Sequence, residues 1–315
     1  MTDTILRHIT GGGETLVGVD WGGSNLRAFR FAPDGAVTEL RSSGRGVAAL
    51  GEQSFEQVLA SVIGDWKTAA ASPLRILLCG MVGGRGGWRE APYVRCPADV
   101  NAVAAGMVRL ETVLGEAWIV PGLSTITPQG FPDVLRGEET QIFGALESSG
   151  DSLVITPGTH SKWCRVRGGR INGFRTYMTG ELFAVLKTHS ILGRLMQGDA
   201  HDDEAFALGV RRALADPDLL GLLFSVRGEG LFNGVAAEAL AAYLSGLLIG
   251  AEVRAGLAEA QDPRHTPILV IAAEGLAELY RQALTLAGAA PSRVIDGGEA
   301  SARGLWRLAL IGVPA

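Results

Sequence analysis

The sequence has few cysteines: only Cys79, Cys96 and Cys164 among its 315 residues. Their number is odd and their spacing wide, so neither a disulfide framework nor a C-x-x-C metal site is predicted. We interpret them as buried or incidental thiols in a reducing compartment. The expected location is therefore the cytoplasm.

The sequence also lacks a long run of charge of one sign. Its 28 Lys and Arg against 33 Asp and Glu give a formal net charge of -5, and no basic segment is long enough to follow a nucleic-acid backbone. A nucleic-acid partner is therefore not expected. Hydrophobic residues make up 47% and charged residues 19%, a composition typical of a globular protein rather than a disordered one.

Long uninterrupted hydrophobic runs are missing as well. Residues 1–14 contain charged side chains and a glycine run, so they predict a flexible leader rather than a signal peptide. The most apolar helical segment, 235–260, is interrupted by Glu238, Glu252 and Arg254. Its uncharged stretch is shorter than the roughly 18 residues that a membrane span needs. We predict a buried packing helix there and no membrane partner.

The opening of the chain predicts an antiparallel meander followed by a helix and a further strand. Short apolar runs separated by turn residues predict strands at 16–20, 26–31 and 36–40. Ser54 and Gln57 form the pattern of a capping box, which predicts a helix that runs to about Thr68. The apolar run 75–79 is the next expected strand.

The segment 153–178 repeats the pattern of this opening. With an offset of 137 residues, Leu16 falls on Leu153 and Arg30 falls on Arg167. Each copy predicts a strand, a glycine-containing polar turn, a strand, a turn and a strand, which favours a duplicated α/β architecture. Further elements are predicted downstream: a strand at 268–272, a helix at 276–287, a strand at 293–295 and a helix at 299–311.

The length supports two lobes, because a single hydrophobic core stops growing at roughly 250–300 residues. We expect residues 15–148 to form an N-terminal lobe and residues 149–315 a C-terminal lobe, facing each other across an interlobe cleft. Ser148, Ser149 and Gly150 favour a hinge between them.

Two familiar nucleotide motifs are absent: the sequence has neither GxxxxGK[ST] nor GxGxxG after a strand. Two glycine turns, at 20–24 and 157–163, offer another way to bind phosphates through backbone N–H groups. Asp20 ends a strand and could hold Mg²⁺ through the water shell of the ion. Either turn alone could be an ordinary one, but matching turns in a duplicated fold favour ATP. The expected nucleotide contacts are Asp20, Gly22, Gly23, Ser24, Gly158, Thr159, His160, Ser161 and Lys162.

Five motifs follow one another across most of the chain: Val17-Gly18-Val19-Asp20-Trp21-Gly22, Gly80-Met81-Val82-Gly83, Arg136-Gly137-Glu138-Glu139-Thr140-Gln141, Pro157 to Trp163, and Met178-Thr179-Gly180-Glu181-Leu182. This set resembles that of the 2-dehydro-3-deoxygalactonokinases. The resemblance implies a two-lobe, actin-like (ribonuclease H-like) ATPase fold. It also implies transfer of the γ-phosphate of ATP to the 6-hydroxyl of 2-dehydro-3-deoxy-D-galactonate. The second glycine turn is the most family-specific element.

Two positions depart from the patterns of such kinases. Gly23 stands where many relatives have a hydroxyl residue, which leaves Ser24 as the hydroxyl donor. Glu274 and Gly275 stand where kinases of this fold commonly have a Gly-Gly pair against the adenosine. We assign both residues to the nucleotide site on this resemblance.

The catalytic base is expected at the start of a helix in the first lobe, where the resemblance implies a carboxylate. Glu138 and Glu139 both occupy that place, and a carboxylate is favourable at a helix N-terminus. Asp133 is the alternative base. The competing interpretation is that the two glutamates only complement the helix dipole at the surface.

A sugar acid needs a cation for its carboxylate, and the fork of an arginine suits this role. Arg85, in a glycine-rich loop after a strand, is the first candidate, with Arg27 and Arg136 as alternatives. Asn25 and Met81 complete the predicted sugar-acid site. Two other functions stay open: a kinase for another sugar or sugar acid, and a regulatory ATPase without an acceptor. A homodimer stays open too.

Overall fold

The structure is a computed structural model, and it describes residues 15–70, 73–147, 150–198, 201–260, 262 and 264–312. The predicted leader, 1–14, lies outside the described residues. So do Ser148 and Ser149 of the predicted hinge.

The chain packs as two units. The first unit comprises the described residues up to Gly150, the segment Arg167–Gly173 and the described residues from Asp296 onward. The second unit comprises Asp151–Val166 and Phe174–Ile295. The division at 148/149 into two lobes stays a prediction, and the contacts of the structure add the C-terminal helix to the first unit.

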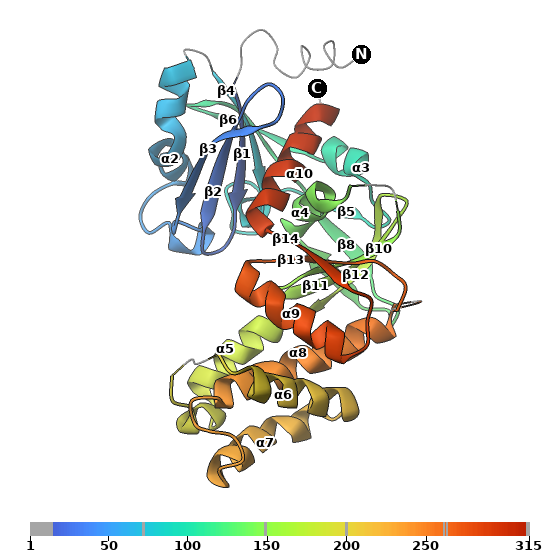
Figure 1. Ribbon diagram of the computed structural model, residues 1–315. Coiled ribbons are helices and arrows are strands. Elements are labelled where there is room, and N and C mark those ends of the chain that lie inside the picture. The colour runs from blue at the N-terminus through green and yellow to red at the C-terminus, as the bar shows by residue number, and fades with distance from the viewer. Residues whose placement is uncertain are drawn as a thin grey trace. The chain divides into compact units, whose positions relative to one another are not determined.

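A mixed six-stranded sheet forms the centre of the first unit (Figure 1). Its strand order is β3-β2-β1-β4-β7-β6. β1 pairs antiparallel with β2 and parallel with β4, and the predicted meander is confirmed. The bounds are β1 Thr15–Trp21, β2 Leu26–Phe31, β3 Val37–Ser43, β4 Leu74–Cys79, β6 Val108–Thr112 and β7 Gly115–Ile119.

A second, three-stranded sheet in this unit was not predicted. Its order is β5-β8-β9, with β5 Tyr93–Arg95, β8 Gly122–Ile126 and β9 Pro132–Leu135. The helices of the first unit are α2 Phe55–Ala70, α3 Val100–Ala105, α4 Glu138–Ala145 and α10 Gly297–Ile311, and the 3-10 helices are η1 Val47–Ala49 and η2 Met81–Gly83.

The capping box before α2 is confirmed. The backbone N–H of Gln57 donates to Ser54 Oγ at 3.2 Å, and the backbone N–H of Ser54 donates to Gln57 Oε1 at 2.8 Å. These reciprocal bonds satisfy donors that would otherwise be unpaired at the start of a helix. The helix then packs Leu59 and Ile63 into the core beside Trp21.

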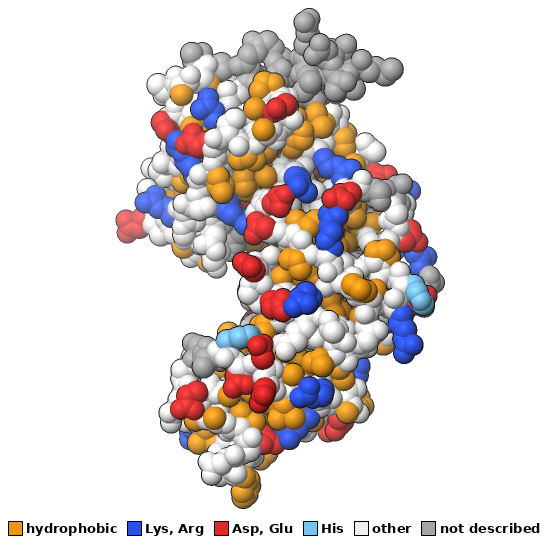
Figure 2. All heavy atoms as spheres, in the orientation of Figure 1, with side chains coloured by type: hydrophobic (Ala, Val, Ile, Leu, Met, Phe, Trp, Pro, Cys, Tyr) orange, Lys and Arg blue, Asp and Glu red, His pale blue; other side chains and the backbone are white. Residues whose placement is uncertain are grey.

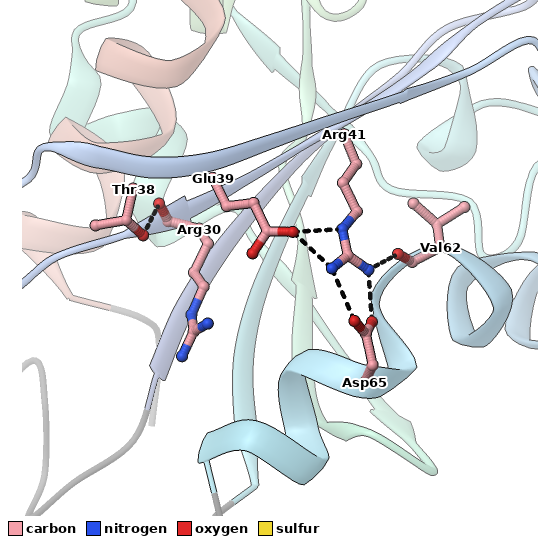
Figure 3. Close-up of polar contacts among 6 residues, drawn as sticks. All are labelled: Arg30, Thr38, Glu39, Arg41, Val62 and Asp65. Atoms are coloured by element: carbon pink, nitrogen blue, oxygen red, sulfur yellow. Dashed lines mark hydrogen bonds and ion pairs between the residues drawn. The ribbon is translucent and has the colours of Figure 1, made fainter.

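Arg41 ties strand β3 to helix α2 (Figure 3). Its guanidinium pairs with Glu39 on its own strand and with Asp65 on α2, and it donates to the carbonyl of Val62 at 2.7 Å. The hydrogen bonds from Arg41 lower the pKa of Asp65. Arg41 also lies over the ring of Trp66 at 4.6 Å. One side chain thus anchors the edge strand of the sheet.

The sheet of the second unit repeats the order of the first. Its five strands run β12-β11-β10-β13-β14, the arrangement of β3-β2-β1-β4-β7 (Figure 1). β10 pairs antiparallel with β11 and parallel with β13. The predicted duplicated α/β fold is confirmed. The bounds are β10 Ser152–Thr156, β11 Ser161–Arg167, β12 Arg170–Tyr177, β13 Ile268–Ile271 and β14 Ser292–Ile295.

The fixed offset of 137 residues between the copies was wrong after the first strand. Arg30 pairs with Val17, 13 positions along the chain, whereas Cys164 pairs with Val154, 10 positions along. The counterpart of Arg30 is therefore Cys164 and not Arg167. The hairpin from Val154 to Cys164 is three residues shorter than the one from Val17 to Arg30, and the difference lies in the strands, because both connections, 22–25 and 157–160, have four residues.

Helices fill the rest of the second unit. They are α5 Thr179–His189, η3 Leu192–Leu195, α6 Asp203–Ala215, α7 Leu219–Leu231, α8 Leu240–Ala258 and α9 Glu274–Leu286. Among the described residues, α8 is the one helix long and apolar enough to cross a membrane, and 72% of that stretch is buried within the protein. The expectation of a packing helix within 235–260 is confirmed, although the helix begins only at Leu240.

Figure 2 shows acidic and basic side chains interspersed over the visible face.

Two glycines let α4 and α10 cross with their backbones in contact. A Cβ on Gly304 would lie 1.9 Å from the carbonyl oxygen of Thr140, and a Cβ on Gly144 would lie 2.0 Å from that of Ala300. No side chain fits there. The predicted last helix is confirmed, and its close packing against α4 accompanies a hydrogen bond from Ser301 of α10 to Asp20 beside the first glycine turn.

Candidate functional site

The first glycine turn presents unpaired backbone N–H groups. The turn closes through a bond from the Gly22 N–H to the Asn25 carbonyl at 2.9 Å. The carbonyls of Gly22, Gly23 and Ser24 accept bonds from the backbone of residues 46–48. No group in the described part of the chain accepts from the N–H of Gly23 or Ser24. These two donors suit an anion such as phosphate.

The Asp20 carboxylate is held in place from two sides. Its Oδ2 accepts from Arg27 Nη2 and from Ser301 Oγ, both at 2.7 Å, and the side chain is 12% exposed. Gln141 Nε2 in turn donates to Ser301 Oγ at 3.3 Å. Both bonds to the carboxylate use Oδ2, which leaves Oδ1 for another ligand.

Ser301 and Gln141 were missed as site residues by sequence reasoning. Ser301 is fully buried and 281 positions from Asp20 in the chain. The only local signal was a turn, Asp296 to Gly298, before a helix rich in small residues. Gln141 stood within a family motif, but nothing in the sequence showed its hydrogen bond to Ser301.

The two glutamates at the start of α4 have different surroundings. Glu139 is fully buried, and its carboxylate accepts from the Gly137 N–H at 2.7 Å and from Thr140 Oγ1 at 2.9 Å. Burial, together with the charge of Glu138, raises the pKa of Glu139 to about 8. Glu138 is half-buried and accepts from the Arg136 N–H at 3.0 Å. The alternative base, Asp133, lies on β9 and accepts from the Val134 N–H.

The buried thiol of Cys79 shows that Asp20 and Glu139 share one neighbourhood. Burial raises the pKa of Cys79 well above its usual value, and the charges of Asp20 and Glu139 add to the effect. Cys79 is also paired with Asp20 across the parallel strands β1 and β4. The first glycine turn and the start of α4 therefore lie close together in the first unit.

The three candidate arginines differ in what they contact. Arg85 is exposed in a turn after η2, and no residue in the described part of the chain pairs with it. Arg27 is paired with Asp20. Arg136 is 9% exposed, donates from Nη2 to the Ala91 carbonyl at 2.7 Å and lies over the ring of Tyr93. The side chain of Met81 is 44% exposed, close to Arg85 in the chain.

The second glycine turn also presents unpaired backbone donors. No group in the described ranges accepts from the N–H of Gly158, Thr159 or His160. The start of α5 supports this turn, because the Glu181 N–H donates to the Thr159 carbonyl at 2.9 Å and the Glu181 carboxylate pairs with His160 Nε2 at 2.5 Å. A Cβ on Gly180 would lie 2.4 Å from the Gly158 carbonyl oxygen, so only glycine permits this approach.

The polar side chains of Ser161 and Lys162 are engaged within the second unit. Both residues are buried. Ser161 Oγ donates to Glu252 Oε1 at 2.6 Å, and Lys162 Nζ donates to the His160 carbonyl at 2.8 Å. These two side chains therefore stabilise the conformation of the turn.

A pocket of about 410 Å³ opens beside the second glycine turn. Its size is that of a small-molecule site, and its wall is largely apolar with a few polar groups. Gly158 belongs to both the turn and the pocket wall. The other lining residues include Thr179, Phe183, Phe206, Ile249, Leu276 and Tyr280. Glu274 and Gly275 are exposed at the start of α9, the helix that supplies part of this wall.

Two sheets of one topology, each with a glycine turn of unpaired N–H groups, define the protein as a member of the duplicated, actin-like α/β fold class. The family model for 2-keto-3-deoxy-galactonokinase matches residues 20–308. The chain therefore belongs to the 2-keto-3-deoxy-galactonokinase family and is a kinase, and the predicted resemblance is confirmed.

Individual relatives are similar in sequence to this chain over most of its length. A Rhizobium meliloti (strain 1021) protein, provisionally named 2-dehydro-3-deoxygalactonokinase, is 39% identical over 305 residues, 92% of this chain and 97% of the relative. The 2-dehydro-3-deoxygalactonokinase of Escherichia coli (strain K12) is 37% identical over 272 residues, with 86% and 90% covered. A Sinorhizobium meliloti crystal structure, provisionally titled as the same enzyme, is 38% identical with a TM-score of 0.85 and covers 93% of this chain and 98% of that one.

Proposed function

We propose that the protein transfers the γ-phosphate of ATP to the 6-hydroxyl of 2-dehydro-3-deoxy-D-galactonate, using Mg²⁺, in the cytoplasm. The family supplies the class of reaction and the sugar acid. The observation that supports ATP as the donor is the unpaired backbone N–H groups of the two glycine turns, at Gly23 and Ser24 and at Gly158, Thr159 and His160. Phosphoryl transfer depends mainly on positioning and on charge stabilisation, and such donors provide both.

The adenosine would bind in the 410 Å³ pocket of the second unit. Gly158 supports this assignment, since it lies in the pocket wall and in the glycine turn that would hold the phosphates. A base and ribose need an apolar wall with a few fixed polar groups. Lys187 and Ser245 supply such groups, and Thr179 and Tyr280 also lie in this wall. Glu274 and Gly275 remain assigned to the nucleotide by resemblance.

Asp20 suits a hydrated Mg²⁺. This ion usually keeps several waters and binds proteins through one or two carboxylates together with substrate phosphates. Arg27 and Ser301 fix the Asp20 carboxylate through Oδ2, so that Oδ1 could accept from a water of the ion. When bound, Mg²⁺ would neutralise charge on the phosphates. The residues of this chain only hold and orient it.

We assign the base to Glu138 and a supporting role to Glu139. A general base must reach the hydroxyl that it deprotonates. Glu138 is half-buried, whereas Glu139 is fully buried and bonded to the Gly137 N–H and Thr140. Glu139 would therefore fix the start of α4, on which Glu138 lies.

Arg85 is the best supported partner of the sugar-acid carboxylate, because it is exposed and no described residue pairs with it. Arg136 packs against the same loop, because a Cβ added to Gly83 would lie only 3.0 Å from Arg136 Nη1. Arg27 already forms an ion pair with Asp20. Asn25 and Met81 would contribute to the remainder of the acid site.

A coupled assay of ADP release against a panel of acceptors tests the proposal. The keto-deoxy galactonate should give the highest kcat/KM, above its gluconate epimer and neutral sugars. A higher kcat/KM for another sugar would identify that sugar as the acceptor in place of the keto-deoxy galactonate. ATP turnover unchanged by every sugar acid would overturn the kinase assignment in favour of a regulatory ATPase.

A further inference from the structure

We propose that Glu252 is a positioning residue of the nucleotide site, which holds the second glycine turn against the wall of the adenosine pocket. The inference rests on the proposed binding of ATP by the second unit. Glu252 lies in α8, is 3% exposed and is not among the residues that line the pocket. It would therefore act through its neighbours and not by touching the nucleotide.

The carboxylate of Glu252 gathers four hydrogen-bond donors. Oε1 accepts from Ser161 Oγ at 2.6 Å and from Trp163 Nε1 at 2.7 Å. Oε2 accepts from Tyr280 Oη at 2.7 Å and from Thr179 Oγ1. The donors come from three separate elements, β11, α5 and α9.

These four donors belong to the two parts of the proposed nucleotide site. Ser161 and Trp163 lie at the start of β11, directly after the second glycine turn, and Thr179 and Tyr280 line the pocket. A single carboxylate thus sets the distance between the turn that would hold phosphate and the wall that would hold adenosine. Gly256, one turn along α8, permits this arrangement, because a Cβ there would lie 2.3 Å from the indole ring of Trp163.

The four donors favour the charged form of Glu252, against the effect of burial. An indole N–H can only donate, and hydroxyl groups that donate leave the glutamate as an acceptor. Burial raises the pKa of Glu252, while the hydrogen bonds from Ser161, Thr179, Trp163 and Tyr280 act in the opposite direction. A buried charge is tolerated where its hydrogen bonds are complete. Four donors on two oxygens meet that condition here.

Two substitutions separate shape from charge. Glu252→Ala removes all four bonds, whereas Glu252→Gln keeps one oxygen for Ser161 and Trp163 and offers an amide to the hydroxyls of Thr179 and Tyr280, which can turn to accept it. The Kd of a non-hydrolysable ATP analogue with Mg²⁺ is measured by calorimetry, with the KM values for ATP and for the sugar acid. Hydrogen bonds to charged groups predict a Kd roughly 10-fold to 100-fold higher for the Ala variant, a smaller rise for Gln, and an unchanged KM for the acid.

Glu259→Gln is a matched control at the end of the same helix. Glu259 pairs with Arg165 and Arg175, and neither arginine lines the pocket. This variant should lower the melting temperature without changing the Kd of the ATP analogue. Tyr280→Phe, which removes one donor at the pocket wall, should raise that Kd even if the Ala variant does not fold.

The outcomes distinguish the inference from the function on which it rests. A wild-type protein that does not bind the ATP analogue would overturn the nucleotide site and this inference together. A wild type that binds, with an unchanged Kd in the Glu252→Gln and Tyr280→Phe variants, would overturn the positioning role alone. Equal rises in the KM for ATP and for the acid would make Glu252 a structural residue.

Discussion

Among the described residues, the carboxylate of Asp20 accepts hydrogen bonds at Oδ2 and none at Oδ1. Asp20→Asn keeps the shape but loses the charge that would attract Mg²⁺, so kcat should fall by at least about 100-fold while the melting temperature changes little. Steady-state kinetics over a range of Mg²⁺ concentrations checks this. Near wild-type turnover would show that Asp20 is only a turn residue.

Glu138 and Glu139 should differ in their effects on rate. Glu138→Gln removes the proposed base, so kcat should fall by roughly 10²-fold to 10⁴-fold. Glu139→Gln should retain more of the activity, because it keeps the shape that holds Gly137. A greater loss in the Glu139 variant, with a wild-type rate that rises through pH 8, would assign the base to Glu139.

The raised pKa of Glu139 also predicts a dependence of stability on pH. Glu139 keeps its proton up to pH of about 8 when folded and loses it near the ordinary value of 4.5 when unfolded. The folded state then binds more protons in that window, so Glu139 makes the protein less stable as pH rises from 4.5 to 8, by up to about 1.4 kcal/mol per pH unit. Denaturant titrations of wild type and Glu139→Gln should diverge across this window. Parallel curves would contradict the prediction.

Arg85 lies on an exposed loop, and no residue that the structure describes pairs with its guanidinium. Arg85→Ala should raise the KM for the sugar acid by about 10-fold or more, since a charge-assisted bidentate contact is lost. The KM for ATP should change far less. Equal changes in the two constants would remove Arg85 from the acid site.

At the scale of elements, the crossing of α4 and α10 depends on Gly304. Gly304→Ala places a methyl group 1.9 Å from the carbonyl of Thr140, so the free energy of unfolding should fall by about 1–3 kcal/mol or more. Gly64→Ala in α2 is the control, because its Cβ meets nothing within 4 Å and should stabilise the helix by about 0.5–1 kcal/mol. Equal melting temperatures for both variants would contradict the packing argument.

Local signals explain which elements were predictable. The capping box of Ser54 and Gln57 acts within one helical turn, and the apolar runs of β1, β2 and β4 each carry their own pattern. The β5-β8-β9 sheet was missed because its strands are short and separated by other elements. The glycine turns of the candidate site could be recognised in the sequence, but Ser301 and Glu252 could not, because their partners lie far away in the sequence.

At the scale of the whole molecule, the proposed acid groups belong to the first unit and the adenosine pocket to the second. We predict that the two ligands are coupled, as the hinge expected from the sequence would allow. Saturating sugar acid should tighten binding of an ATP analogue with Mg²⁺, and the analogue should tighten binding of the acid by the same factor. Calorimetric titrations in both orders measure the two factors. Identical affinities with and without the acid would mean that no coupling exists.

The bond between Ser301 and Asp20 has a consequence for the growing chain. Ribosomes add about 5–20 residues per second, so the 281 positions between these residues correspond to roughly 14–56 s. During that interval the strand with Asp20 exists, but the helix that completes its surroundings does not. The second unit, inserted before α10, can be synthesised in full while the first is still unfinished. The proposed catalytic unit, although begun first, is therefore the later of the two to mature.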